Sequence, residues 1–194
     1  MKSLLILAAL AIGAASAIDL PRRSPEFVIH KASGEQELLS KYRGKVVACE
    51  FLYTTCSHCQ HTAGTFSKLE EEFGARGFQA LGIAFNEMAG MLVPDFVRDF
   101  KPTFPVGWGP REQVMAYLGL KPDERFVVPQ VVLMDRKGVI RFQSPPLGDP
   151  TLQDEKYLRE RISELLGENG ITIKRPVTNV RPPVSAVKRA AESK

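Results

Sequence analysis

The chain has 194 residues, of which 44% are apolar and 25% are charged, as is ordinary for a soluble globular protein with one full core. The net charge of +4 comes from the ends, because residues 18–166 carry 19 basic and 20 acidic side chains whereas residues 167–194 carry 6 and 2. A nearly neutral domain argues against nucleic-acid binding, and three cysteines are too few for a disulfide-stapled scaffold.

Residues 1–17 have the pattern of a cleaved signal peptide. A short basic start precedes an apolar run from Leu4 to Ala15, and Ala15, Ser16 and Ala17 fit the small-x-small rule of signal peptidase. A membrane anchor is the alternative, but about a dozen apolar residues are too few to span a bilayer core of ~30 Å. We therefore expect a mature protein that begins at Ile18 and is periplasmic or secreted, without stable membrane insertion.

Strands and helices are predicted to alternate through residues 18–166. An extended arm at 27–30 and a short helix at 35–42 precede a buried strand at 45–53. After a helix that follows Cys56, a strand is expected at 78–85, a loop at 86–91, a helix from Pro94 to about Phe100 and an extended piece at 103–106. The last elements are a helix at 111–118, a hairpin of strands 126–134 and 139–142, and a helix at 154–166.

This order predicts an α/β fold, with a mixed sheet covered by helices on both faces. The pieces between residues 86 and 106 form an extra strand/helix insertion beyond the minimum. Residues 167–194 contain Pro176, Pro182 and Pro183 with scattered Lys and Arg, and they offer too little apolar surface to fold. We expect a disordered basic tail there.

The motif Cys56-Ser57-His58-Cys59 stands where the strand at 45–53 ends and an amphipathic helix begins. The first thiol therefore lies at a helix N-terminus, where unpaired N–H groups and the positive dipole end favour a thiolate. Cys56 is the expected nucleophile of disulfide exchange. Cys59, three residues further on, returns to the same helix face and is the expected resolving thiol of a redox-active disulfide.

A pair of cysteines at this spacing also occurs in zinc sites and in structural disulfides. Zinc needs four ligands, and the chain offers no second such pair beside scattered His30, Cys49, His58 and His61. A structural disulfide across so small a loop would constrain the unfolded chain little. The redox interpretation is favoured, and no metal or other cofactor is expected. Cys49, inside the apolar strand, is expected to be buried and inert.

With these elements placed, the chain resembles the thioredoxin fold over roughly residues 26–166, in particular the exported TlpA-type thiol:disulfide oxidoreductases. Beyond the dithiol and its helix, the resemblance rests on Phe104-Pro105-Val106 ahead of a helix, and on Val128-Pro129 leading into a strand and the turn from Asp135 to Gly138. It implies a thioredoxin-like enzyme that acts on protein thiols and disulfides and is recharged by a membrane or periplasmic redox donor.

The resemblance also implies roles for single residues. Pro129 matches the family's cis-proline, which leaves the Val128 backbone free to pair with a substrate strand. Glu50 stands where thioredoxins carry a buried acid that moves protons to and from the resolving thiol, although a glutamate pointing to solvent at a strand end is the alternative. His58 lies between the cysteines as in the more oxidising relatives, where it would stabilise the Cys56 thiolate; otherwise it is a solvent-exposed side chain.

Three positions depart from the family pattern. Thr55, at the substrate surface, replaces the usual tryptophan before the first cysteine, Gly64 stands where a helix-kinking proline is common, and Gln130 follows the cis-proline where threonine is frequent. Each touches the substrate surface or its support, so the departures bear on partner identity rather than on the fold.

Two other functions remain open. A thiol peroxidase of related fold would place a threonine three residues before its reactive cysteine, and Tyr53 occupies that position here. A copper-binding or delivery protein could use Cys56, Cys59 and a histidine, because soft thiolates suit Cu(I). The favoured function is thiol-disulfide exchange with protein partners through Cys56 and Cys59.

Overall fold

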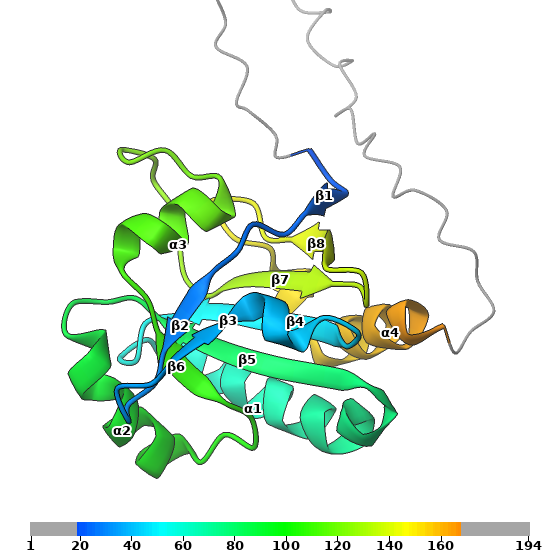
Figure 1. Ribbon diagram of the computed structural model, residues 1–194, viewed down its shortest axis with the longest axis horizontal. Helices are drawn as coiled ribbons and strands as arrows, with labels where there is room; N and C mark the ends of the chain where they lie inside the picture. The colour runs from blue at the N-terminus through cyan, green and yellow to red at the C-terminus, as the bar shows by residue number, and fades with distance from the viewer. Residues whose placement is uncertain (1–18, 168–194) are drawn as a thin grey trace, which may run out of the picture.

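An eight-stranded mixed sheet runs through the part of the chain that the computed structural model describes, residues 19–167 (Figure 1). Its strands lie in the order β1-β8-β7-β4-β5-β6-β2-β3. Their bounds are β1 Arg22–Arg23, β2 Val28–His30, β3 Gln36–Leu38, β4 Val46–Leu52, β5 Phe78–Ala84, β6 Val106–Trp108, β7 Gln130–Met134 and β8 Val139–Gln143. The expected signal peptide at 1–17 and all but the first residue of the expected tail lie outside the described residues.

The two central strands explain the position of the site. Every residue of β4 and β5 is buried, as expected for the apolar, β-branched sequence of strands covered on both faces. β4 pairs parallel with β5 and antiparallel with β7, and β6 continues the sheet parallel to β5. The carboxyl ends of three parallel strands therefore meet at one edge of the sheet, where the chain leaves β4 for Cys56.

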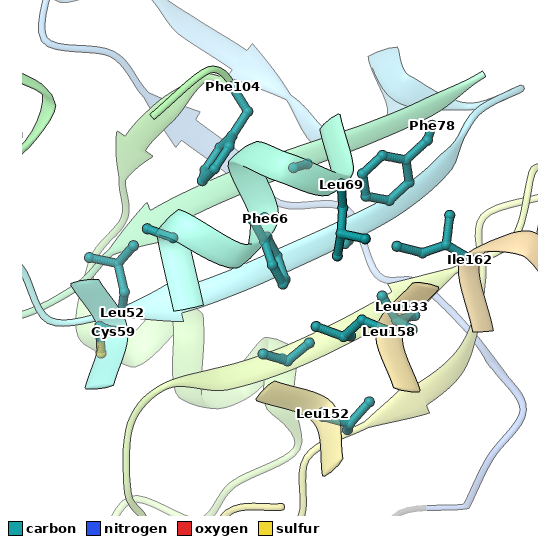
Figure 2. Packing of buried hydrophobic residues seen from close by; sticks show 14 of the residues in the cluster. Leu52, Cys59, Phe66, Leu69, Phe78, Phe104, Leu133, Leu152, Leu158 and Ile162 are labelled. Atoms are coloured by element: carbon teal, nitrogen blue, oxygen red, sulfur yellow. The ribbon is translucent and has the colours of Figure 1, made fainter. Parts of the chain in front are cut away.

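Helices cover both faces of this sheet. α1 (Ser57–Phe73), α2 (Ala89–Phe100) and α4 (Glu155–Leu166) pack on one face, and α3 (Arg111–Leu118) packs on the other (Figure 1). Figure 2 shows the first core, in which Phe66 and Leu69 of α1 meet Leu133 of β7 and Leu158 of α4. Burying one such side chain contributes about 1.5–3 kcal/mol. The predicted α/β class, with helices on both faces and a strand/helix insertion made by α2 and β6, is confirmed.

Most predicted elements form within a few residues of their expected bounds, and α3 has the bounds that the sequence predicts. The predicted helix at 35–42 is wrong in its first half: Gln36–Leu38 is strand β3, which pairs with β2 across a turn containing Gly34 at φ +86°, and only Leu39–Tyr42 forms a 3-10 helix. Tertiary pairing with β2 therefore overrides the local helical pattern there.

Three further corrections concern the start of helix α2, the start of strand β7, and a short strand that pairs with β8. α2 begins at Ala89, so Pro94 lies inside the helix instead of starting it, because the Met88 carbonyl already accepts the Leu92 N–H at 3.1 Å. β7 begins at Gln130 and leaves 126–129 outside the sheet, since Pro129 has no N–H to donate to a strand pair. The two-residue strand β1, unforeseen in the sequence, pairs with β8.

Candidate dithiol site

The dithiol lies directly beyond the carboxyl end of β4. Cys56 caps the N-terminus of α1 with extended backbone angles (φ −88°, ψ 120°), and its carbonyl accepts the Gln60 N–H at 3.0 Å. A turn precedes it, closed by the Cys56 N–H donating to the Tyr53 carbonyl at 3.1 Å. The structure thus places the first cysteine where the sequence predicts it, at the positive end of a helix of 17 residues.

The two thiols differ in exposure. Both cysteines are free thiols in the structure; Cys56 is half-buried, whereas Cys59 is completely buried on the inward face of α1. Burial strongly raises the pKa of the Cys59 thiol, and the neighbouring charges of Glu50 and Cys56 raise it further. Cys56 is therefore the more accessible of the two sulfurs, and Cys59 holds its proton more tightly than an exposed thiol would.

Glu50 lies in the core behind the dithiol. Its exposed fraction is 0%, and neither carboxylate oxygen has a hydrogen-bond partner within residues 19–167. It lies on the same face of β4 as Ala48 and Leu52, which belong to the core under α1, so the buried orientation favoured from the sequence is the one observed. Burial first, and then the Cys56 charge, raises the pKa of Glu50 well above its ordinary value.

The loop before β7 brings a backbone carbonyl to the first thiol. The Val128–Pro129 peptide bond is cis, as the resemblance implies, and the Cys56 Sγ lies 3.9 Å from the Val128 carbonyl oxygen, to which it donates. Pro129 is buried and Val128 is half-buried. Residues 72 apart in the sequence thus form one surface around Cys56.

Gln130 holds this loop in place, a role that the sequence did not reveal. Its buried side-chain amide donates to the carbonyls of Val127 (2.8 Å), Pro145 (3.2 Å) and Pro146 (3.1 Å). The amide therefore ties the Val127–Pro129 loop to the segment that follows β8. Its appearance in place of the family's frequent threonine was the available signal, but the three acceptors come from distant segments that only the fold identifies.

Other predicted residues lie at the surface. Thr55 is exposed beside Cys56, and His58 is exposed in the first turn of α1, with no hydrogen bond from its ring to any part of 19–167. Cys49 is free and completely buried, and burial raises its thiol pKa. Within the described residues no group of three His, Cys, Asp or Glu side chains could hold a metal ion.

Two contacts that the sequence did not predict fix the residues before Cys56. The Asn86 side chain accepts the Thr54 N–H at 3.0 Å and donates to the Thr54 hydroxyl at 3.2 Å. Arg111, at the start of α3, donates to the Tyr53 hydroxyl at 2.6 Å. Asn86 follows β5 with only Phe85 between them, so a polar residue at the carboxyl end of a parallel strand was the available signal for it.

This arrangement of a thiol at a helix N-terminus, a buried second thiol, a buried acid and a cis-proline loop defines a thioredoxin-like thiol:disulfide oxidoreductase. The chain belongs to the AhpC/TSA family, whose model matches residues 21–143. It is 27% identical over 126 residues to the thiol-disulfide oxidoreductase ResA of Geobacillus thermodenitrificans, covering 65% of this chain and 69% of that protein. Over 126 residues it is 26% identical to the thioredoxin-like protein YneN of Bacillus subtilis, covering 62% and 68%.

Solved structures agree on the fold. A protein from Chlorobium tepidum, assigned as the thiol:disulfide interchange protein DsbE, superposes with a TM-score of 0.65 at 24% identity, covering 78% of this chain and 100% of that chain. The thioredoxin-type fold and oxidoreductase class expected from the resemblance are therefore confirmed. Within residues 19–167, no helix is long and apolar enough to cross a membrane.

Proposed function

We propose that this protein exchanges disulfides with protein partners through Cys56 and Cys59. The observation that carries the proposal is the pairing of a half-buried Cys56 thiol, at the N-terminus of α1 and beside the Val128 carbonyl, with a completely buried Cys59 thiol behind it. Such a pair separates an attacking sulfur from a resolving sulfur. Names of relatives such as ResA support the same activity.

In the reducing direction, the Cys56 thiolate attacks one sulfur of a partner disulfide and releases the other as a thiolate. The mixed disulfide is then attacked by the Cys59 thiolate at the Cys56 sulfur, which releases the second partner thiolate and leaves a Cys56–Cys59 disulfide. Two electrons pass from the dithiol to the partner. The reverse sequence oxidises a partner dithiol, and the redox donor or acceptor that recharges the pair determines the direction.

Five residues around the dithiol support these steps in the proposal. Glu50 accepts the proton of Cys59, because a carboxyl with a strongly raised pKa is matched to a buried thiol whose pKa is also raised. Val128 and Thr55 contact the partner chain on either side of Cys56, with Pro129 fixing the turn. His58 stabilises the Cys56 thiolate through the charge that it carries when protonated.

We further propose that the exchange takes place in the periplasm or outside the cell, after removal of residues 1–17. The signal-like composition of those residues supports this location, and an oxidising compartment suits a redox-active dithiol. N-terminal sequencing of the exported protein should find Ile18 first. Retention of Met1 in a membrane fraction would contradict the proposal.

The partner can be captured on the protein itself. A Cys59→Ala variant cannot resolve the mixed disulfide, so partner proteins should remain attached to Cys56 and be released by a reductant. Cys56→Ala with Cys59→Ala is the matched control and should capture nothing, whereas Cys49→Ala with Cys59→Ala should capture the same partners. Capture that depends on Cys49 instead of Cys56 would overturn the assignment.

A thiol peroxidase is the second candidate, favoured by the AhpC/TSA family match. The position three residues before Cys56, where such enzymes carry threonine, holds Tyr53, whose hydroxyl is bonded to Arg111. Hydrogen peroxide consumption coupled to thiol oxidation measures this activity directly. We expect it to be slow compared with reduction of a protein disulfide, and a faster peroxide reaction would make the peroxidase the principal function.

A further inference from the structure

A wide groove opens beside the dithiol, at the carboxyl ends of β4, β5 and β6. It encloses about 1100 Å³ and lies between the segment 86–91 and the segment 108–112. Aromatic rings line it from three neighbouring strands: Tyr53 after β4, Phe85 after β5 and Trp108 at the end of β6. Met88 and Met91 are also on its lining and are 64% and 71% exposed, so this apolar surface faces solvent in the isolated chain.

The groove and the dithiol are parts of one rigid surface. Tyr53 lines the groove and stands three residues before Cys56, whose N–H bonds to the Tyr53 carbonyl. Asn86, which also lines the groove, holds Thr54 through the two hydrogen bonds described above. One hydrogen-bonded turn therefore joins the groove wall to the sulfur at which a partner polypeptide becomes attached.

Arg111 lies where the groove meets the Val128–Pro129 loop. Its guanidinium donates to the Tyr53 hydroxyl at 2.6 Å, and its Cζ lies 4.8 Å from the centre of the Phe126 ring. Phe126 in turn stacks on Phe85, with ring centres 5.9 Å apart. The Arg111 side chain is exposed, but its contacts with the two aromatic side chains hold the guanidinium in place.

This cation has no acidic partner within residues 19–167. Other arginines at the surface form ion pairs, such as Arg98 with Asp95 and Asp99, Arg141 with Asp135 at 2.6 Å and Arg159 with Glu72 at 2.8 Å. Arg111 keeps unused N–H donors, although Glu112 follows it in α3 and lines the same groove. A fixed guanidinium with free donors is suited to bind a carboxylate with two parallel hydrogen bonds.

We propose that the groove binds an extended segment of the partner protein next to its reactive cysteine, with an apolar side chain against Met88, Met91 and Trp108 and an acidic residue on Arg111. The inference rests on the proposed exchange activity and names the sequence chemistry of its substrates. Methionine side chains adapt to differently shaped apolar groups, whereas the single fixed cation discriminates by charge. Glu87, Glu112 and Lys31 also line the groove, so the selection for acid is local to Arg111.

The test uses the reduced mature protein and a set of peptides that differ in one residue. Each peptide carries one cysteine in a mixed disulfide with 2-mercaptoethanol, one leucine, and either Asp or Lys at a single position within four residues of the cysteine. For the best position, the wild type should reduce the Asp peptide about three- to tenfold faster than the Lys peptide, measured as kcat/KM. The ratio should shrink in 0.5 M NaCl, because the contact is partly exposed to solvent.

Two Arg111 variants and one control decide the assignment. Arg111→Gln should abolish the preference and Arg111→Glu should reverse it. The control is Lys156→Glu, which also replaces a cation by glutamate but does so on an exposed site of α4. It should keep the wild-type preference for the Asp peptide over the Lys peptide. A separate variant, Met91→Asp, should slow both peptides because it places a charge on the apolar wall. Circular dichroism of each variant checks that it is folded.

Each outcome separates this inference from the proposed activity. If the wild type reduces bis(2-hydroxyethyl) disulfide but shows no Asp preference at any position, the groove assignment fails and the exchange activity stands. A preference that survives Arg111→Glu overturns the role of Arg111. If the wild type reduces neither the small disulfide nor any peptide, the exchange activity itself is wrong.

Discussion

Replacing Glu50 with glutamine tests both the fold and the chemistry of the dithiol. Glu50 is completely buried, and burial together with the Cys56 charge holds its pKa well above the ordinary value of 4.5. One pKa unit corresponds to about 1.4 kcal/mol. Each unit by which burial raises this pKa therefore costs the folded state about 1.4 kcal/mol at a pH above both the folded and the unfolded values.

The sign of the pH dependence follows from the raised pKa. Above pH 4.5 the folded protein retains a proton that the unfolded chain has released, so the contribution of Glu50 to stability falls as the pH rises. Glutamine does not titrate. Glutamine in place of Glu50 (Glu50→Gln) should leave the free energy of unfolding nearly unchanged at pH 4 and raise it progressively above pH 4.5, by at most about 1.4 kcal/mol for each pH unit, measured by urea denaturation of the reduced protein.

The same variant should lose rate in one step only. Because Glu50 is proposed to accept the Cys59 proton, stopped-flow measurements should show slower release of the mixed disulfide, by tenfold or more, with little change in the first attack by Cys56. Glu71→Gln, on an exposed site of α1, is the matched control and should change neither quantity. A stability difference that does not vary with pH, or equal slowing of both steps, would refute the reasoning.

Four other predictions test the remaining assignments. His58→Ala should make the reduction potential more negative by about 5–20 mV in a glutathione titration, as expected for loss of an exposed charge near a helix end, whereas His61→Ala should not. Burial would raise the pKa of Glu37, but hydrogen bonds from Lys31, Lys41 and Tyr42 outweigh it and lower the pKa to about 2. Glu37→Gln should therefore cost about 1–3 kcal/mol at pH 7, a difference that fades as the pH falls from about 4.5 towards 2 in acid-unfolding curves; a constant difference would contradict the ion-pair account. Phe66→Ala should lower the free energy of unfolding by about 3–5 kcal/mol, because the fully buried ring leaves a cavity under α1, and a loss below 1 kcal/mol would show that this core is loosely packed. Removing residues 168–194 should leave the rate of disulfide exchange unchanged, because a tail rich in Pro and Lys adds no core, and a fall of several degrees in Tm would show that it docks on the domain.

The helices and central strands could be predicted because their signals are local. The apolar run 45–53 gave β4, and apolar residues at helical spacing gave α1, with Cys56 at its start. Prediction was wrong where a distant pairing overrode the local pattern. The residues of Gln36–Leu38 are compatible with a helix, yet this segment forms a strand along β2. In that position Glu37 is buried and its carboxylate forms ion pairs with the amino groups of Lys31 and Lys41, each with an N–O distance of 2.6 Å.

The sequence by itself determined the reactive pair, its helix and the α/β class, since the spacing of the two cysteines and the alternation of strand and helix patterns require no knowledge of distant contacts. Only the tertiary structure decided what surrounds the pair. Gln130 meets carbonyls 15 and 16 residues away, and Arg111 meets Tyr53 across 58 residues. These contacts depend on the strand order of the sheet, which brings β4, β5, β6 and the start of β7 to one edge, and local sequence patterns do not encode that order.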